Sequence, residues 1–153
     1  MAVERIPPDQ AAQRMKDGWT YVDVRSIPEF DAGHPQGAYN VPLMHATSRG
    51  LVANPDFLSV MSARFAKDQP IILGCRAGGR SYQAAVALMR EGFTRVVDMR
   101  GGFAGEFTRQ GVEVCAGWQP RRLPVAATAE PGRSYRELTS SDRDSEQTDR
   151  DSE

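Results

Sequence analysis

The chain has 153 residues, 40% hydrophobic and 25% charged, a composition typical of one globular domain with its own core. The formal net charge is −1, and residues 130–153 hold eight acidic and four basic side chains, so the rest of the chain carries +3. A charge of +3 is too small for a surface that binds nucleic acid. No apolar run approaches the roughly 18 residues that span a membrane. We therefore expect neither nucleic acid nor membrane as a partner.

The first residues show no basic stretch followed by an apolar core, so no secretory signal is predicted. The two cysteines, Cys75 and Cys115, are far apart in the sequence and do not suggest a disulfide framework. We expect a reducing compartment, the cytoplasm. His34, His45 and the cysteines show no metal-ligand spacing, and we expect no metal and no cofactor.

In the N-terminal half, apolar runs alternate with helical patterns. Strands are predicted at 3–6, 19–25 and 38–41. The middle run is apolar almost throughout, which favours a parallel sheet covered on both faces. Proline positions and apolar spacing predict helices at 8–16 and 27–32. Residues 33–37 form a turn cluster, and a loop of middling polarity is expected at 44–53.

The same alternation continues in the second half. Strands are predicted at 70–74 and 95–99. Helices are predicted from Asn54, as N-cap, to 65, then at 81–91 and 103–109. Residues 111–124, with Trp118, are expected to pack back on the body. Strands alternating with helices predict an α/β domain with a mostly parallel sheet, in which ligands bind beyond the carboxyl ends of the strands.

The composition changes after Leu123. Leu138 is the last aliphatic residue, and Asp142–Glu146 recurs seven residues later as Asp149–Glu153. A coiled coil needs apolar heptad positions, and this repeat has none. We predict a domain over residues 1–124 and a disordered acidic tail over residues 125–153.

The stretch expected to carry chemistry is Cys75-Arg76-Ala77-Gly78-Gly79-Arg80-Ser81, between a predicted strand and a predicted helix. Backbone N–H groups at a helix start lack intrahelical partners and carry partial positive charge. A turn with two glycines can direct more N–H groups inward and form an anion-binding concavity. Such a site stabilises negative charge on a cysteine sulfur. We predict Cys75 as a nucleophile and Arg76 through Ser81 as an anion-binding cradle.

Three ordered motifs make residues 3–124 resemble the rhodanese domain family in its single-domain form. They are Tyr21–Arg25 with Pro28–Phe30 and Gly33–Pro42, then Cys75–Ser81, then Asp98–Phe103. The resemblance implies a five-stranded parallel sheet flanked by helices, with the active-site loop around the cysteine.

The resemblance also implies sulfur transfer. In family members the cysteine takes a sulfane sulfur from a donor such as thiosulfate, holds it as a persulfide and passes it to a thiophilic acceptor, cyanide or a thiol. A protein persulfide is a further possible partner. Arg76 and Arg80 can neutralise the donor and the departing sulfite, while loop amides hold the persulfide charge.

Two other functions stay open. Related phosphatases and arsenate reductases have five residues between the cysteine and the arginine, whereas four separate Cys75 from Arg80. The shorter loop favours sulfur over phosphate. The second alternative is a non-catalytic or regulatory rhodanese module that binds a partner protein, against which the intact loop argues.

Other polar residues near these motifs have expected roles. Ser81 is predicted as an N-cap. Arg80 either contacts the anion or braces the loop through a salt bridge, and Cys115 could resolve a persulfide as a disulfide. Structural support through ion pairs and hydrogen bonds is predicted for Asp23, Arg25, Glu29 and His34.

Overall fold

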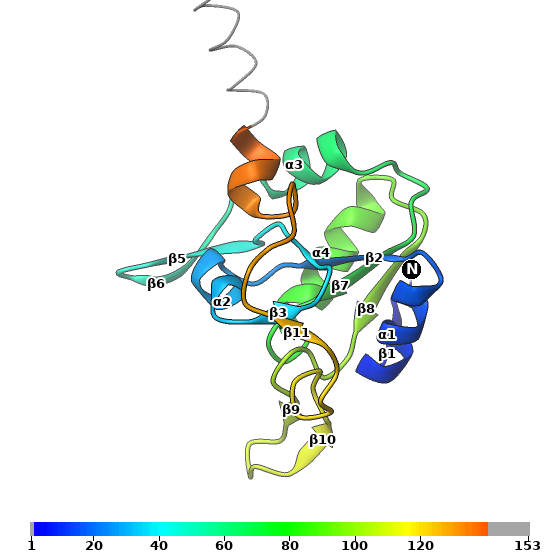
Figure 1. Ribbon diagram of the computed structural model, residues 1–153, viewed down its shortest axis with the longest axis vertical. Coiled ribbons are helices and arrows are strands. Elements are labelled where there is room, and N and C mark those ends of the chain that lie inside the picture. Colours follow the sequence, from blue (N-terminus) through cyan, green and yellow to red (C-terminus); the bar gives the residue numbers. More distant parts are fainter. Residues whose placement is uncertain (1, 141–153) are drawn as a thin grey trace, which may run out of the picture.

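The computed structural model describes residues 2–140 and contains a central sheet with helices on both faces (Figure 1). The sheet has five parallel strands in the order β1-β8-β7-β2-β4. In that order the strands are Glu4–Ile6, Val96–Met99, Ile71–Gly74, Thr20–Asp23 and Tyr39–Asn40. This confirms the predicted α/β fold with a five-stranded parallel sheet.

The central strand β7 is buried at every position. Successive side chains of a strand point to opposite faces of the sheet, and here both faces are covered. Ile71 and Leu73 belong to one hydrophobic cluster and Ile72 to the other. The continuous apolar run before Cys75 is therefore explained by burial on two sides, and it fixes where the following loop begins.

Within residues 2–140, helices flank the sheet on both faces. They include α1 Pro8–Lys16, α2 Ile27–Asp31, α3 Phe57–Arg64 and α4 Gly79–Arg90. Helices α3 and α4 contribute to the cluster on one face, and α1 packs on the opposite face together with Trp118 (Figure 1). Within residues 2–140, each helix is too short or too polar to span a bilayer.

Residues 44–53 form an antiparallel hairpin, and the prediction of a loop was wrong here. Its strands are β5 Met44–Thr47 and β6 Gly50–Ala53. The Thr47 hydroxyl donates to the Gly50 carbonyl at 2.8 Å and accepts from the Arg49 N–H at 3.1 Å, which closes the turn. Because β6 is exposed along its whole length, the sequence lacks the apolar alternation that marks a half-buried strand.

The predicted helix at 103–109 is absent, and this is a second correction. Turns are followed by β9 Glu106–Phe107, which pairs with β10 Glu113–Cys115. The Phe103 N–H donates to the Cys75 carbonyl at 2.7 Å, and the Ala104 N–H donates to the Arg76 carbonyl at 2.9 Å. These N–H groups hold the neighbouring loop, and Gly105 at φ +118° leaves helical geometry altogether.

Two helices begin at other residues than predicted. Helix α3 begins at Phe57, because the Asn54 side chain accepts from the Asp56 N–H at 3.0 Å and donates to the Pro42 carbonyl at 2.9 Å. Asn54 thus closes a turn before the helix, a common alternative to capping for this residue type. Helix α4 begins at Gly79, with Gly78 as its N-cap.

Residues 125–140 pack on the domain, so the boundary predicted at residue 124 lies too early. Strand β11 Val125–Ala126 pairs with β3 His34–Pro35 on the α1 side of the molecule. The chain then crosses to α3, where helical residues 135–140 bury Leu138 to 7% exposure (Figure 1).

Hydrogen bonds fasten this crossing segment to the rest of the domain. The Asn40 N–H of β4 donates to the Arg133 carbonyl at 2.9 Å, and the Arg133 guanidinium donates to the Gly37 carbonyl at 2.7 Å. At the far end, the Arg64 guanidinium donates to the Leu138 carbonyl at 2.8 Å. Single buried residues spaced along a polar segment carry no periodic signal, which is why composition alone suggested a tail. The rest of the predicted tail, 141–153, lies outside the described residues.

Candidate active site

Residues Cys75–Ser81, here called the Cys75 loop, run from the end of β7 into the first turn of α4. Cys75 is 2% exposed. Its Sγ accepts a hydrogen bond from the Gly78 N–H at 3.0 Å and lies 3.3 Å from the Ser81 hydroxyl oxygen. The sulfur thus lies at the start of a helix, among groups that favour negative charge.

Gly78 gives the loop its shape. It caps α4 at φ +115°, a conformation that glycine adopts without steric cost. This conformation turns its N–H toward the sulfur. A side chain there would also approach the Arg5 Nη2 atom, which lies 3.2 Å from an ideal Cβ position.

The rim of the loop is open. Arg76, Ala77 and Gly79 are exposed, whereas Ser81 is fully buried beneath them. No salt bridge joins Arg76 to another residue within 2–140, so its exposed guanidinium has no ion-pair partner there. Ser81 does not act as the predicted N-cap, because that position belongs to Gly78.

Arg80 is engaged by Glu29 of α2. Two hydrogen bonds, of 2.8 and 2.9 Å, join its guanidinium to the two carboxylate oxygens. Glu29 also accepts from the Ser26 hydroxyl at 2.8 Å. The hydrogen bond from Arg80 is the main reason why the pKa of Glu29 falls from 4.5 to about 2. Of the two roles considered for Arg80, the structure places it in the salt bridge that braces the loop.

Asp23 and Arg25 form a buried ion pair at the end of β2. The Arg25 guanidinium donates to Asp23 Oδ2 at 2.7 Å and to the Gly33 carbonyl at 2.7 Å. The Arg25 Cζ atom lies over the Phe103 ring, 4.4 Å from the ring centroid. The Asn40 side chain donates to the carbonyls of both paired residues at 3.0 Å. The structure therefore brings these two residues together in a framework next to the loop.

His34 is 1% exposed and stacks on Phe30, with 3.6 Å between ring centroids. Its Nδ1 lies 2.8 Å from the Phe30 carbonyl oxygen, so the ring joins β3 to α2. A hydrogen-bonding brace is the role that we predict for His34.

Two residues near the loop, Arg5 and Asp98, were missed by the sequence reasoning. Asp98 is fully buried at the end of β8, and its Oδ2 accepts from the Arg5 Nε at 2.8 Å. Burial raises the pKa of Asp98, against the opposing effect of Arg5. An acid inside the apolar run 95–99 was the available signal for Asp98. Arg5 offered none, because its partner is 93 positions away.

Cys115 lies on β10, and both cysteines are free. Its Sγ lies 3.7 Å from the Arg121 Nη2. An ideal Cβ on Gly101 would lie 2.9 Å from the same sulfur. No hydrogen bond or disulfide within the described chain joins it to Cys75, and its part in resolving a persulfide stays a prediction.

The fold and the loop define a class: a parallel α/β domain with a cysteine cradled at the carboxyl end of its central strand. A family model described as Rhodanese-like domain matches residues 7–105. The chain belongs to the rhodanese-like domain family.

Named relatives agree with this placement. Rhodanese-like domain-containing protein 15, chloroplastic, of Arabidopsis thaliana is 37% identical over 120 residues, covering 78% of this chain and 59% of the relative. Thiosulfate sulfurtransferase 16, chloroplastic, of the same plant is 46% identical over 87 residues, covering 57% of this chain and 72% of the relative. The chain thus spans less than two thirds of the first relative's length.

A solved structure also matches the fold. The crystal structure of Rv0390 from M. tuberculosis superposes with a TM-score of 0.69 at 28% identity, covering 84% of this chain and all of the other.

Proposed function

We propose that this protein is a sulfurtransferase that moves a sulfane sulfur, from thiosulfate or a related donor, to cyanide or a thiol through a persulfide on Cys75. The observation that carries the proposal is the setting of the Cys75 sulfur. It accepts from the Gly78 N–H at 3.0 Å at the start of α4, where negative charge is favoured. Relatives named thiosulfate sulfurtransferase support the same class.

The first step loads the cysteine. The Cys75 thiolate attacks the outer sulfur of thiosulfate, a new sulfur–sulfur bond forms, and the donor's own sulfur–sulfur bond breaks. Sulfite leaves with the electron pair, so no external oxidant or reductant is needed. Arg76, exposed and without an ion-pair partner in the described chain, supplies positive charge for the donor and for the departing sulfite.

The second step unloads it. A cyanide ion or an acceptor thiolate attacks the outer sulfur of the persulfide, and Cys75 leaves as the thiolate from which the cycle began. Cys75 itself is 2% exposed, whereas the outer sulfur lies about 2 Å further along the bond. The acceptor therefore reaches the outer sulfur before it can reach the Cys75 Sγ atom. Its attack on the outer sulfur transfers that sulfur to the acceptor.

The engagement of Arg80 argues against phosphate or arsenate chemistry. Both carboxylate oxygens of Glu29 accept hydrogen bonds from its guanidinium, so Arg80 is not free to bind a tetrahedral dianion. Its role in this proposal is to position the loop, together with the Asp23–Arg25 pair and His34. We place the reaction in the cytoplasm, with a small anionic donor or a protein persulfide as partner and with no cofactor.

Mass spectrometry of the intact protein tests the proposal. After incubation with thiosulfate and removal of excess donor, the protein should gain the mass of one sulfur atom, located on Cys75, and cyanide should remove it. Cys75→Ser should gain nothing and lose all thiosulfate:cyanide turnover, while Cys115→Ser should behave as the original chain. The sulfurtransferase proposal would be wrong if Cys75 gained no sulfur and the protein turned over neither thiosulfate nor persulfide donors. The alternative of a module that binds a partner protein would then remain.

A further inference from the structure

Asp98 is a buried acid that neither step of sulfur transfer uses. Its side chain is fully buried at the end of β8, and its Oδ2 accepts from the Arg5 Nε at 2.8 Å. Within residues 2–140, its other oxygen, Oδ1, has no hydrogen-bond partner. A buried polar atom without a partner costs free energy, and folded proteins rarely contain one. The position of Oδ1 therefore calls for a functional explanation.

The sheet places Asp98 and Cys75 on the same face. Asp98 pairs in register with Leu73, and side chains two residues apart on a strand share a face. Leu73 and Cys75 belong to the hydrophobic cluster that α4 covers, and so does Val96, two residues before Asp98. The first turn of α4 contributes Ser81, which is fully buried over this part of the sheet.

Ser81 lies between the cysteine and the acid. Its hydroxyl oxygen is 3.3 Å from the Cys75 Sγ. Burial has the largest effect on the pKa of Asp98 and raises it, while Ser81 and Arg5 are close enough to lower it in part. A thiolate can only accept a hydrogen bond, so the Ser81 hydroxyl donates to an ionised Cys75. Its single proton is then not available to Asp98 Oδ1, which explains why that oxygen lacks a partner.

We propose that Asp98 is a positioning residue for sulfur transfer, which competes with the Cys75 sulfur for the Ser81 hydroxyl. The inference rests on the proposed function. Before sulfur is loaded, Asp98 places a like charge behind Ser81, so the thiolate is less stabilised and more nucleophilic. When the new sulfur–sulfur bond forms, Sγ becomes a neutral bridging sulfur and the negative charge resides on the outer sulfur. The Ser81 hydroxyl then keeps its proton and donates it in a hydrogen bond to Oδ1.

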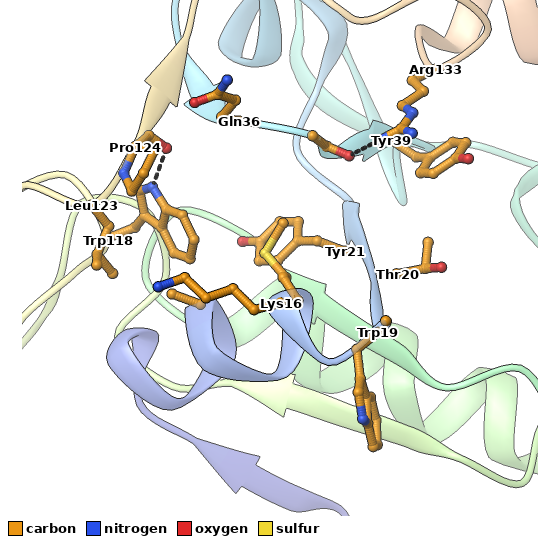
Figure 2. A pocket seen from close by; sticks show the side chains of 14 residues that line it. Lys16, Trp19, Thr20, Tyr21, Gln36, Tyr39, Trp118, Leu123, Pro124 and Arg133 are labelled. Carbon is orange, nitrogen blue, oxygen red and sulfur yellow. Dashed lines mark hydrogen bonds between the residues drawn. The ribbon is translucent and has the colours of Figure 1, made fainter.

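Other ionisable groups around these residues are paired or lie on the far face of the sheet. Glu106 of β9 adds to the raised pKa of Asp98 and is itself in a salt bridge. Arg80 is held by its salt bridge to α2. Figure 2 shows the Tyr21 ring on the α1 side, beside Trp118. Burial raises the pKa of Tyr21 well above its usual value, so this phenol stays protonated.

The first test needs no sulfur donor. Cys115→Ser removes the only other cysteine, so the rate of Cys75 alkylation by iodoacetamide can be followed by intact mass from about pH 5 to about pH 10. In this background, Asp98→Asn should move the half-maximal rate about one pH unit lower. The plateau rate should fall about threefold, because a better stabilised thiolate is a weaker nucleophile. Asp68→Asn, an exposed aspartate before β7, is the control and should change neither value.

A double-substitution cycle tests whether Asp98 acts through Ser81. Because Ser81→Ala removes the shared hydroxyl, Asp98→Asn should shift the alkylation profile of that chain by less than half as much. Circular dichroism confirms that each variant is folded. If Asp98→Asn does not fold, Arg5→Met combined with Asp98→Val replaces both charged partners by apolar side chains and serves for the same comparison.

Sulfur loading gives the second readout. At fixed concentrations of thiosulfate and sulfite, the ratio of persulfide to free Cys75 should fall about fivefold in Asp98→Asn, because the loaded state loses a charge-assisted hydrogen bond. Three results would overturn the proposal: an unchanged or higher half-maximal pH, equal shifts with and without the Ser81 hydroxyl, and an unchanged persulfide ratio. A chain that gains no sulfur but shows the shifted alkylation profile would contradict the sulfurtransferase function and support the coupling of Asp98 to Cys75.

Discussion

Arg76 and Arg80 belong to the same loop but have different surroundings. The Arg80 side chain is 16% exposed and held by both oxygens of Glu29. Arg76 is exposed and has no salt bridge to a described residue. Since the charge of Arg80 is largely compensated by Glu29, Arg76 provides most of the uncompensated positive charge of the Cys75 loop. We therefore propose that Arg76 attracts the anion and that Arg80 maintains the geometry of the loop.

The Glu29–Arg80 pair should make stability depend on pH in the acid range. The pKa of Glu29 is about 2 in the folded protein, against 4.5 ordinarily, so the folded state binds its proton less readily than the unfolded state. The stabilisation is complete above pH 4.5 and is lost as the pH falls toward 2. Because the pair is partly exposed, we expect Glu29→Gln to cost about 1–2 kcal/mol at pH 7.

Urea unfolding at pH 7, 4.5 and 3 measures this effect. The gap in unfolding free energy between the original chain and Glu29→Gln should be constant from pH 7 to 4.5 and should shrink at pH 3. Glu113→Gln, an exposed glutamate on β10, serves as the control and should show no such gap. A gap that stays constant down to pH 3 would contradict a carboxylate stabilised by Arg80.

At the scale of elements, the turn after β8 supports the Cys75 loop from beneath. Gly102 has φ +62°, and an ideal Cβ on it would lie within 2.4 Å of the Arg76 carbonyl oxygen. A methyl group there must push the backbone of the loop. Gly92 at the end of α4 also has positive φ, at +103°, but an added Cβ would meet nothing within 4 Å.

Substitutions of these two glycines distinguish the cost of a left-handed backbone conformation from the cost of a steric clash with the Cys75 loop. Gly92→Ala should cost about 1–2 kcal/mol, the usual penalty of a left-handed conformation, with turnover of thiosulfate unchanged. Gly102→Ala should cost about 2–4 kcal/mol and reduce turnover at least about tenfold, because the loop that holds the Cys75 sulfur is displaced. Urea unfolding and cyanide-dependent turnover measure the two effects, and equal loss of activity in both variants would argue against a specific contact.

The elements that could be predicted from the sequence are those with local signals. Strand β7, the Cys75 loop and the start of α4 follow one another directly in the sequence. The apolar run of the strand, the two glycines of the loop and the helical pattern after it could therefore be interpreted together. The helix predicted at 103–109 was wrong because its N–H groups bind the carbonyls of Cys75 and Arg76, which are distant in sequence. The Arg5–Asp98 contact joins β1 and β8, which are neighbours in the sheet but lie far apart in the sequence, so no local pattern predicts that these two residues pair.

At the scale of the whole molecule, residues 125–140 should contribute to stability. They supply the β3–β11 pairing, the buried Leu138 and the hydrogen bonds of Arg133. Burial of one leucine stabilises by about 2 kcal/mol, and each hydrogen bond adds about 1 kcal/mol. A chain ending at residue 124 should therefore lose about 3–5 kcal/mol of unfolding free energy relative to one ending at residue 140. Urea unfolding of both chains measures the difference, and equal midpoints would contradict a structural role for the segment.

The hydrogen bond from the Asn40 N–H to the Arg133 carbonyl has a consequence for association between molecules. Strand β4 is the last strand on its side of the sheet, and its outward backbone groups could pair with a strand of another copy. The crossing segment occupies that position with its own backbone. Exposure of β4 in the chain ending at residue 124 would thus invite edge-to-edge aggregation, in which solubility fails at protein concentrations that the longer chain tolerates.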